Sequence, residues 1–138
     1  MFNIKHTSEE GLIVAVDFDG TILQSEYPNV GEPIPYAVQS LNKMIDVGIR
    51  IVIWTCRSDI LPVIDFLDAH NIEVDAINSN NALTQKEWEK FNWKNSRKIG
   101  ADVYIEDRGF INPIDVFGWT LIAKKLIHRY KKREGAFY

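Results

Sequence analysis

Short apolar runs rich in β-branched residues recur along the chain and predict the strands of a sheet. Four such runs stand out, at residues 12–18, 49–54, 74–78 and 103–105. Runs that are apolar at consecutive positions, rather than at alternate ones, are typical of strands buried on both faces, as in a parallel sheet. We therefore expect four buried strands that lie side by side.

Segments with apolar residues three or four positions apart lie between these runs and predict helices. The spacing predicts helices over 35–47 and 59–70. Gly48 is a suitable stop for the first helix, because glycine readily adopts the left-handed conformation that ends many helices. Ser58 or Asp59 is a suitable N-cap for the second helix, because a side-chain oxygen there can accept a backbone N–H.

Two further helices are predicted nearer the C-terminus. Thr84 and Glu87 form a T-x-x-E capping box that would open one helix, and the apolar spacing over 119–130 predicts another. Strands that alternate with helices imply βαβ units. The sequence therefore predicts an α/β fold, a three-layer Rossmann-like parallel sheet with helices on both faces, as a single domain over 1–138.

Charge and cysteine content narrow the setting of the protein. The net charge of −3 and the pI near 5.6 give no general attraction to nucleic acid or to anionic membranes. The single cysteine, Cys56, cannot form an internal disulfide, which fits a reducing compartment. Neither a signal peptide nor a transmembrane span is visible in the sequence. We expect a cytoplasmic protein without membrane association.

Acidic and hydroxyl side chains follow the predicted strands, at the edge where parallel sheets bind ligands. Asp17 and Asp19 end the first run, Thr55 follows the second, and Glu106 and Asp107 follow the fourth. Asp17 and Asp19 would point to the same side of an extended chain, because they lie two positions apart. A carboxylate can attack phosphorus and form an aspartyl phosphate. A purely structural acidic loop is less favoured, because unpaired buried acids are costly.

The sequence DFDGT, which begins at Asp17, resembles the first motif, D-x-D-G-T, of the haloacid dehalogenase-like (HAD) superfamily. The resemblance implies that Asp17 is the nucleophile and Asp19 the general acid/base. It also implies that the stretch after Asp17, with Phe18, Gly20 and Thr21, holds the phosphoryl group of the substrate. Glycine in this stretch allows a sharp turn and a close backbone approach to an anion.

Two later motifs of the same superfamily have candidates in this chain. Thr55 matches the hydroxyl residue of the second motif and can donate a hydrogen bond to a phosphate oxygen. Arg57 follows as in members with T-x-R, and either contacts substrate or pairs with an acid such as Asp59. Lys98 is our candidate for the lysine of the third motif, because it lies closest before the fourth strand. The alternatives are Lys86, Lys90 and Lys94.

The fourth motif of the superfamily is an acidic pair at a strand end, which YIEDR supplies as Glu106 and Asp107. Mg²⁺ prefers an octahedral shell of oxygens and uses one or two protein carboxylates. The resemblance implies a Mg²⁺ cofactor held by Asp17, the backbone carbonyl of Asp19 and Asp107. Glu106 stands where many relatives have aspartate, which leaves open whether it binds the metal directly or through water.

Many members of this superfamily carry a cap domain over the site, and this chain has no room for one. Residues 20–54 and 80–97 are too few for a cap beyond the predicted elements. We expect residues 22–35, with three prolines, to form a loop over the site with Tyr27 near its tip. An uncapped site suits a large or macromolecular phosphorylated substrate. Alternatively, another subunit of a homo-oligomer supplies the lid.

The predicted function is a Mg²⁺-dependent phosphatase that hydrolyses a phosphomonoester through Asp17. The alternatives are a phosphotransferase with the same first step and a non-catalytic module that binds phosphate or a partner. A two-metal nuclease is less favoured, because the D-x-D-G-T arrangement serves covalent catalysis. Nucleic acid stays open as a substrate, although the net charge does not favour it.

Overall fold

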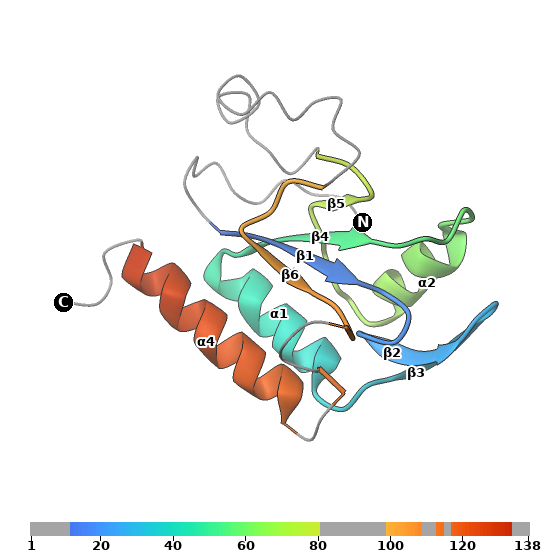
Figure 1. Ribbon diagram of the computed structural model, residues 1–138, viewed down its shortest axis with the longest axis horizontal. Helices are drawn as coiled ribbons and strands as arrows, with labels where there is room; N and C mark the ends of the chain where they lie inside the picture. Colours follow the sequence, from blue (N-terminus) through green and yellow to red (C-terminus); the bar gives the residue numbers. More distant parts are fainter. Residues whose placement is uncertain (1–11, 81–98, 109–112, 115–116, 134–138) are drawn as a thin grey trace.

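A parallel four-stranded sheet in the order β5-β4-β1-β6 forms the centre of the fold (Figure 1). The computed structural model describes residues 12–80, 99–108, 113–114 and 117–133. The strands are β1 (Ile13–Asp17), β4 (Arg50–Trp54), β5 (Ala76–Ile77) and β6 (Val103–Ile105). The four apolar runs therefore form the predicted parallel strands, although β5 is shorter than expected.

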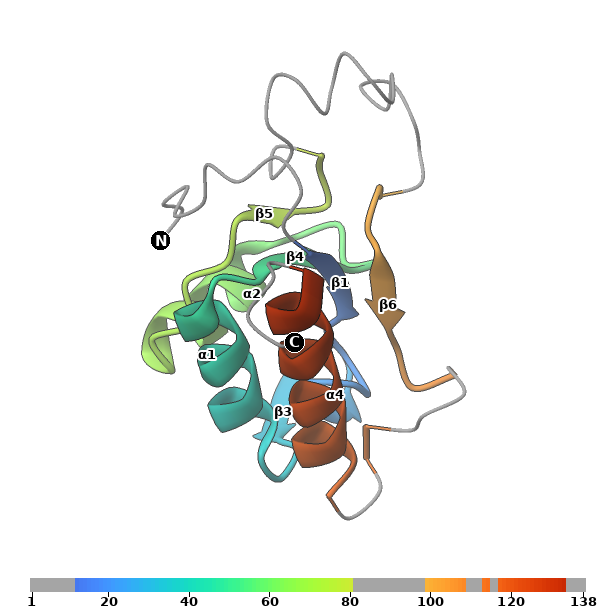
Figure 2. The same cartoon turned by 90° about the vertical axis from the view of Figure 1, so that its left-hand side faces the viewer.

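Three helices lie in the described part of the chain: α1 (Ala37–Val47), α2 (Leu61–Ala69) and α4 (Gly118–Arg133). Helices α1 and α4 pack side by side along the sheet (Figure 2). Their bounds agree with the predicted helices to within a few residues. The α/β fold with a parallel sheet is thus confirmed.

Alternate residues of each strand supply two separate apolar clusters. Val14 and Val16 of β1 belong to a large core that also takes the buried residues of α1, α2 and α4. Ile13 and Ala15 point the other way, into a smaller cluster that includes Ile99. Burial on both faces explains why the strands are apolar at consecutive positions.

Helices on the second face of the sheet stay a prediction. All three described helices contribute to the large core on the first face. The helix expected to open at Thr84 lies outside the described residues.

The predicted helix ends have a clear physical basis in the structure. Gly48 ends α1 in the left-handed region at φ 114°, and its N–H donates to the carbonyl of Ile45 at 3.0 Å. At the start of α2, the Leu61 N–H donates to Asp59 Oδ1 at 3.1 Å. The N-cap residue of α2 is Ile60, so the prediction of Ser58 or Asp59 as N-cap was wrong by one or two positions, although Asp59 still accepts the first helical N–H. The helix begins two residues later than the predicted start.

The expectation of a loop over residues 22–35 was wrong, because most of this segment is a β-hairpin. Strand β2 (Leu23–Glu26) pairs antiparallel with β3 (Asn29–Pro33), and Tyr27 lies at the turn as predicted. Most side chains of the hairpin are exposed and few are β-branched, so the segment lacks the sequence pattern of a strand. None of the helices in the described ranges is long and apolar enough to cross a membrane.

Candidate active site

The carboxyl ends of β1, β4 and β6 meet at a cavity of about 450 Å³. Residues Asp17 and Trp54 pair across β1 and β4, and Val16 pairs with Ile105 across β1 and β6. The strand register therefore brings the ends of three predicted strands to one place. The cavity is lined by Asp17, Asp19, Trp54, Thr55, Cys56, Glu106, Asp107 and Arg108.

Asp17 lies in the most acidic part of this cavity. The pKa of Asp17 is raised to about 6, mainly by burial and further by the negative charges of Asp107, Asp19 and Glu106. One oxygen of the carboxylate, Oδ1, accepts the N–H of Phe18 at 2.9 Å. No backbone N–H in the described part of the chain donates to the other oxygen, Oδ2. An ionised Asp17 would thus be favoured by a cation in the cavity.

The side chain of Asp19 is turned toward Arg57. Nε and Nη2 of the guanidinium donate to the two carboxylate oxygens at 2.6 Å and 2.8 Å. This bond to Asp19 raises the pKa of Arg57 above its usual value. Arg57 is 7% exposed and is not among the residues that line the cavity. Of the two predicted roles for Arg57, the structure therefore shows pairing with an acid, which is Asp19 rather than Asp59.

Gly20 allows the turn after Asp19 to lie against Asp107. Its φ of 81° is in the left-handed region, and a Cβ there would lie 3.1 Å from Asp107 Oδ2. The group that Gly20 approaches here is the Asp107 side chain, and its predicted approach to a phosphoryl group stays a prediction. Asp107 therefore lies beside the loop that carries Asp19.

Thr55 is held in place by Asn78, a residue that the sequence analysis did not select. The Thr55 N–H donates to Asn78 Oδ1 at 2.7 Å, and Asn78 Nδ2 donates to the Thr55 carbonyl at 2.9 Å. The Thr55 hydroxyl accepts the N–H of Arg57 at 3.1 Å. Asn78 ends the third apolar run, so its position at a strand end was the available signal.

Thr21 is not among the residues that line the cavity, and its role in binding substrate stays a prediction. Its side chain is fully buried, and its carbonyl accepts the indole N–H of Trp119 at 2.8 Å. The ring of Phe18 is also fully buried and packs edge-on against Phe66, with 5.4 Å between the centroids. Phe18 contacts Asp17 through its backbone N–H.

The predicted third motif cannot be placed. Lys98 and the alternatives Lys86, Lys90 and Lys94 lie outside the described residues. The assignment of Lys98 stays a prediction.

The acidic residues of the cavity suit a hard cation, although they do not form a complete cage. Among the described residues, no group of three or more Asp, Glu, His or Cys side chains is arranged as a metal site. The pairing of Asp19 with Arg57 removes one carboxylate from such a group. Mg²⁺ needs only one or two protein carboxylates, because it keeps several waters. Burial raises the pKa of Asp17 most and the neighbouring acids raise it further, and a cation beside the carboxylate would offset both effects.

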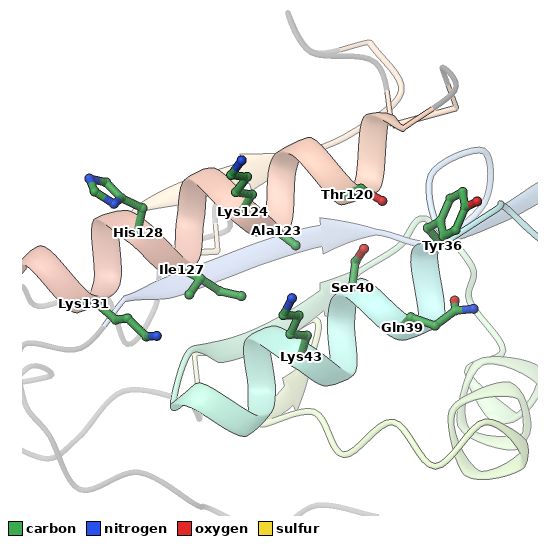
Figure 3. Close-up of a pocket in the computed structure, with 10 residues that line it drawn as sticks. All are labelled: Tyr36, Gln39, Ser40, Lys43, Thr120, Ala123, Lys124, Ile127, His128 and Lys131. Carbon is green, nitrogen blue, oxygen red and sulfur yellow. The ribbon is translucent and has the colours of Figure 1, made fainter. Parts of the chain in front are cut away.

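A second cavity, of about 530 Å³, lies between α1 and α4 and has a different character (Figure 3). Lys43, Lys124 and Lys131 line it, together with His128 and three hydroxyl-bearing residues, and none of the described residues that line it is a carboxylate. It cannot offer a nucleophilic acid or an oxygen site for Mg²⁺. The cavity at the strand ends is therefore the candidate active site.

Comparisons with known proteins show a relationship between this chain and a solved structure. No protein-family model matches the chain, and no curated protein matches it. A solved structure described as the conserved protein coded by a locus from Bacteroides thetaiotaomicron is 30% identical, with a TM-score of 0.70. The match covers 86% of this chain and 92% of that one. At this identity and coverage, the chain belongs to the same family as that conserved protein.

Proposed function

We propose that this protein is a Mg²⁺-dependent phosphatase of the HAD type, which hydrolyses a phosphomonoester through an aspartyl phosphate on Asp17. The observation that carries the proposal is the position of Asp17, at a strand end in a cavity shared with Thr55 and Asp107. The resemblance of DFDGT to the first HAD motif supports the same roles.

In the first step, a carboxylate oxygen of Asp17 attacks phosphorus, and the bond from phosphorus to the leaving oxygen breaks. Oδ2 is the suitable oxygen, because Oδ1 is bonded to the Phe18 N–H. That bond also fixes the direction of the carboxylate, which favours an in-line attack. The leaving oxygen takes a proton from Asp19, which must be protonated for this step.

In the second step, Asp19 takes a proton from water, and the water oxygen attacks phosphorus. The bond between phosphorus and the Asp17 oxygen breaks, which releases inorganic phosphate and restores the carboxylate. The bonds from Arg57 fix the orientation of the Asp19 carboxylate.

Asp17 and Asp107 would hold Mg²⁺, together with the backbone carbonyl of Asp19, and Glu106, which lines the same cavity, would bind it either directly or through water. The bound ion would supply positive charge to the phosphoryl oxygens and to the crowded acids. The Thr55 hydroxyl would donate a hydrogen bond to a phosphoryl oxygen.

An uncapped site is part of the proposal. Between Asp19 and Thr55 the chain forms the hairpin, α1 and β4, all of them within the basic fold. Nothing in that stretch forms a separate domain over the cavity. An open site of this kind suits a phosphate on a large molecule.

The test is hydrolysis of p-nitrophenyl phosphate with and without Mg²⁺, for the wild type, Asp17→Asn and the control Asp65→Asn. Asp65 is an exposed acid on α2, so its loss should leave the rate unchanged. We expect Mg²⁺-dependent release of phosphate that falls roughly 1,000-fold or more in Asp17→Asn, as for loss of a covalent nucleophile. Equal rates of hydrolysis in the wild type and Asp17→Asn would refute the role of Asp17 as the nucleophile.

Because an open site suits a large substrate, larger phosphorylated molecules form a second set of test substrates. If p-nitrophenyl phosphate is not hydrolysed, phosphopeptides and 5′- or 3′-phosphorylated oligonucleotides should be tried under the same conditions. No Mg²⁺-dependent release from any of them would contradict the phosphatase proposal. Transfer of the phosphoryl group to an added alcohol in place of water would instead indicate a phosphotransferase.

A further inference from the structure

The guanidinium of Arg57 connects the candidate active site to the tip of the β-hairpin. On one side, Nε and Nη2 donate to the Asp19 carboxylate at 2.6 Å and 2.8 Å. On the other side, Nη1 donates to the Pro28 carbonyl at 3.1 Å and Nη2 to the Asn29 carbonyl at 2.9 Å. Pro28 lies in the turn between β2 and β3, and Asn29 is the first residue of β3. The same charged group thus holds a catalytic candidate and the hairpin turn.

Aromatic rings enclose the guanidinium as well. Arg57 Cζ lies 4.9 Å from the ring centroid of Tyr27 and 5.7 Å from that of Phe18. Both distances are within the range of a cation–π contact. Phe18 belongs to the core and Tyr27 is 66% exposed at the hairpin turn. The exposed ring therefore covers a charge that would otherwise face water.

These contacts leave little of Arg57 for a substrate. An arginine has five N–H donors, and the bonds to Asp19, Pro28 and Asn29 use all but one. Arg57 is nearly buried and does not line the cavity. A buried guanidinium depends on its acidic partner, because an unpaired buried charge is unfavourable. The hairpin contacts of Arg57 therefore depend on the carboxylate of Asp19.

We propose that Arg57 is a positioning residue that couples the orientation of the Asp19 carboxylate to the docking of the hairpin tip beside the active site. When Asp19 turns toward the cavity, it gives up both bonds to Arg57. The guanidinium then loses the charge that offsets its burial, and the tip held by the same guanidinium loosens in the same event. The part played by Asp19 in turnover rests on the proposed phosphatase function, whereas the coupling itself does not.

Amide hydrogen exchange tests the coupling without any need for turnover. Exchange would be followed by mass spectrometry over residues 23–33 in the wild type, Arg57→Gln and Asp19→Asn. Asp19→Asn keeps the shape of the side chain and removes its charge. We expect at least about tenfold faster exchange in the hairpin of both variants, with β1 and β4 unchanged.

Asp59→Asn is the matched control for charge near Arg57. Asp59 contributes to the field at Arg57 without bonding to it, and an asparagine can still accept the Leu61 N–H. Hairpin exchange should stay at the wild-type rate in this variant. Wild-type exchange in the Asp19→Asn hairpin would overturn the coupling, and so would faster exchange in Asp59→Asn equal to that in Asp19→Asn.

Steady-state kinetics of Arg57→Lys test the positioning role. Lysine keeps the positive charge and loses the paired bonds to both carboxylate oxygens. We expect kcat to fall about 10- to 100-fold while KM changes less than about threefold, at a temperature where the variant is fully folded. A raised KM with unchanged kcat would show direct substrate binding and overturn the proposal. If the wild type hydrolyses no phosphate ester, the phosphatase proposal fails, and the exchange experiment still decides the coupling.

Discussion

The backbone of Gly20 lies against the carboxylate of Asp107, so that a Cβ on residue 20 would come within 3.1 Å of Oδ2. The two residues come from the end of β1 and the end of β6, which are neighbouring strands. Their contact joins the loop that follows the predicted nucleophile to a predicted ligand of Mg²⁺. A side chain at position 20 would therefore disturb both this loop and the Asp107 carboxylate.

Gly20→Ala should disturb the site as well as the fold. We expect a loss of about 1–3 kcal/mol in stability, because alanine is strained at the φ of 81°. We also expect weaker Mg²⁺ dependence, because the added methyl group displaces the Asp107 carboxylate. Thermal unfolding and the Mg²⁺ dependence of hydrolysis measure the two effects.

Gly48→Ala is the matched control for Gly20→Ala. Gly48 has φ 114°, and its Cβ would collide with the Tyr130 hydroxyl, away from the cavity. The Gly48→Ala variant should be less stable than the wild type, while its hydrolysis should depend on Mg²⁺ as in the wild type. An unchanged Mg²⁺ dependence in Gly20→Ala would show that Asp107 can relax without consequence.

Asp17→Asn should stabilise the protein at neutral pH while it abolishes turnover. The pKa of Asp17 rises from 3.8 to about 6 on folding, so the folded state binds the proton more tightly than the unfolded state. The resulting loss of folding stability is absent below about pH 4, grows as the pH rises to 6 and reaches its full size above pH 6. The neutral amide of asparagine avoids this loss.

The pH dependence of thermal unfolding measures this effect. We expect the free energy of unfolding of Asp17→Asn to exceed that of the wild type by roughly 1–2 kcal/mol at pH 7–8. This difference is smaller than the full pKa shift implies, because water screens the half-buried carboxyl. The difference should disappear near pH 4. A difference that is constant from pH 4 to pH 8 would show that the charge of Asp17 is not its source.

Asp107→Asn should weaken the binding of Mg²⁺. Replacement of a carboxylate by an amide removes a negative ligand, and we expect the apparent Kd for Mg²⁺ to rise roughly tenfold or more. Because a ligand stabilises the folded state that binds it, Mg²⁺ should raise the Tm of the wild type more than that of the variant. Asp68→Asn, an exposed acid of α2, serves as the control. Identical Mg²⁺ titrations of the wild type and Asp107→Asn would refute the ligand role.

Asn78 should support catalysis through Thr55. Asn78→Gly removes both bonds to Thr55 and tolerates the φ of 52° at this position, whereas Asn78→Ala adds backbone strain. We expect kcat to fall about tenfold in both variants, since the hydroxyl of Thr55 is no longer fixed. The alanine variant should lose about 1–3 kcal/mol more stability than the glycine variant. A wild-type kcat in Asn78→Gly would show that Thr55 needs no such support.

The strands and helices of the core were predictable because local patterns determine them. Consecutive apolar residues required burial on both faces, and helical spacing required one buried face. The grouping of Asp17, Thr55 and Asp107 was also predictable, because parallel strands place their carboxyl ends at one edge. The hairpin was missed, because its exposed polar strands have no apolar face to reveal them.

By itself, then, the sequence determined the parallel sheet, the helices of one face and the set of acids at the strand ends. Only the tertiary structure decided which polar groups became partners. Arg57 bonds to Asp19 across 38 positions and Asn78 to Thr55 across 23, and the indole N–H of Trp119 donates to the Thr21 carbonyl across 98. Such pairs depend on where loops from different strands come to lie, because hydrogen bonds need contact within a few ångströms, and hydrophobic spacing along the chain carries no record of that.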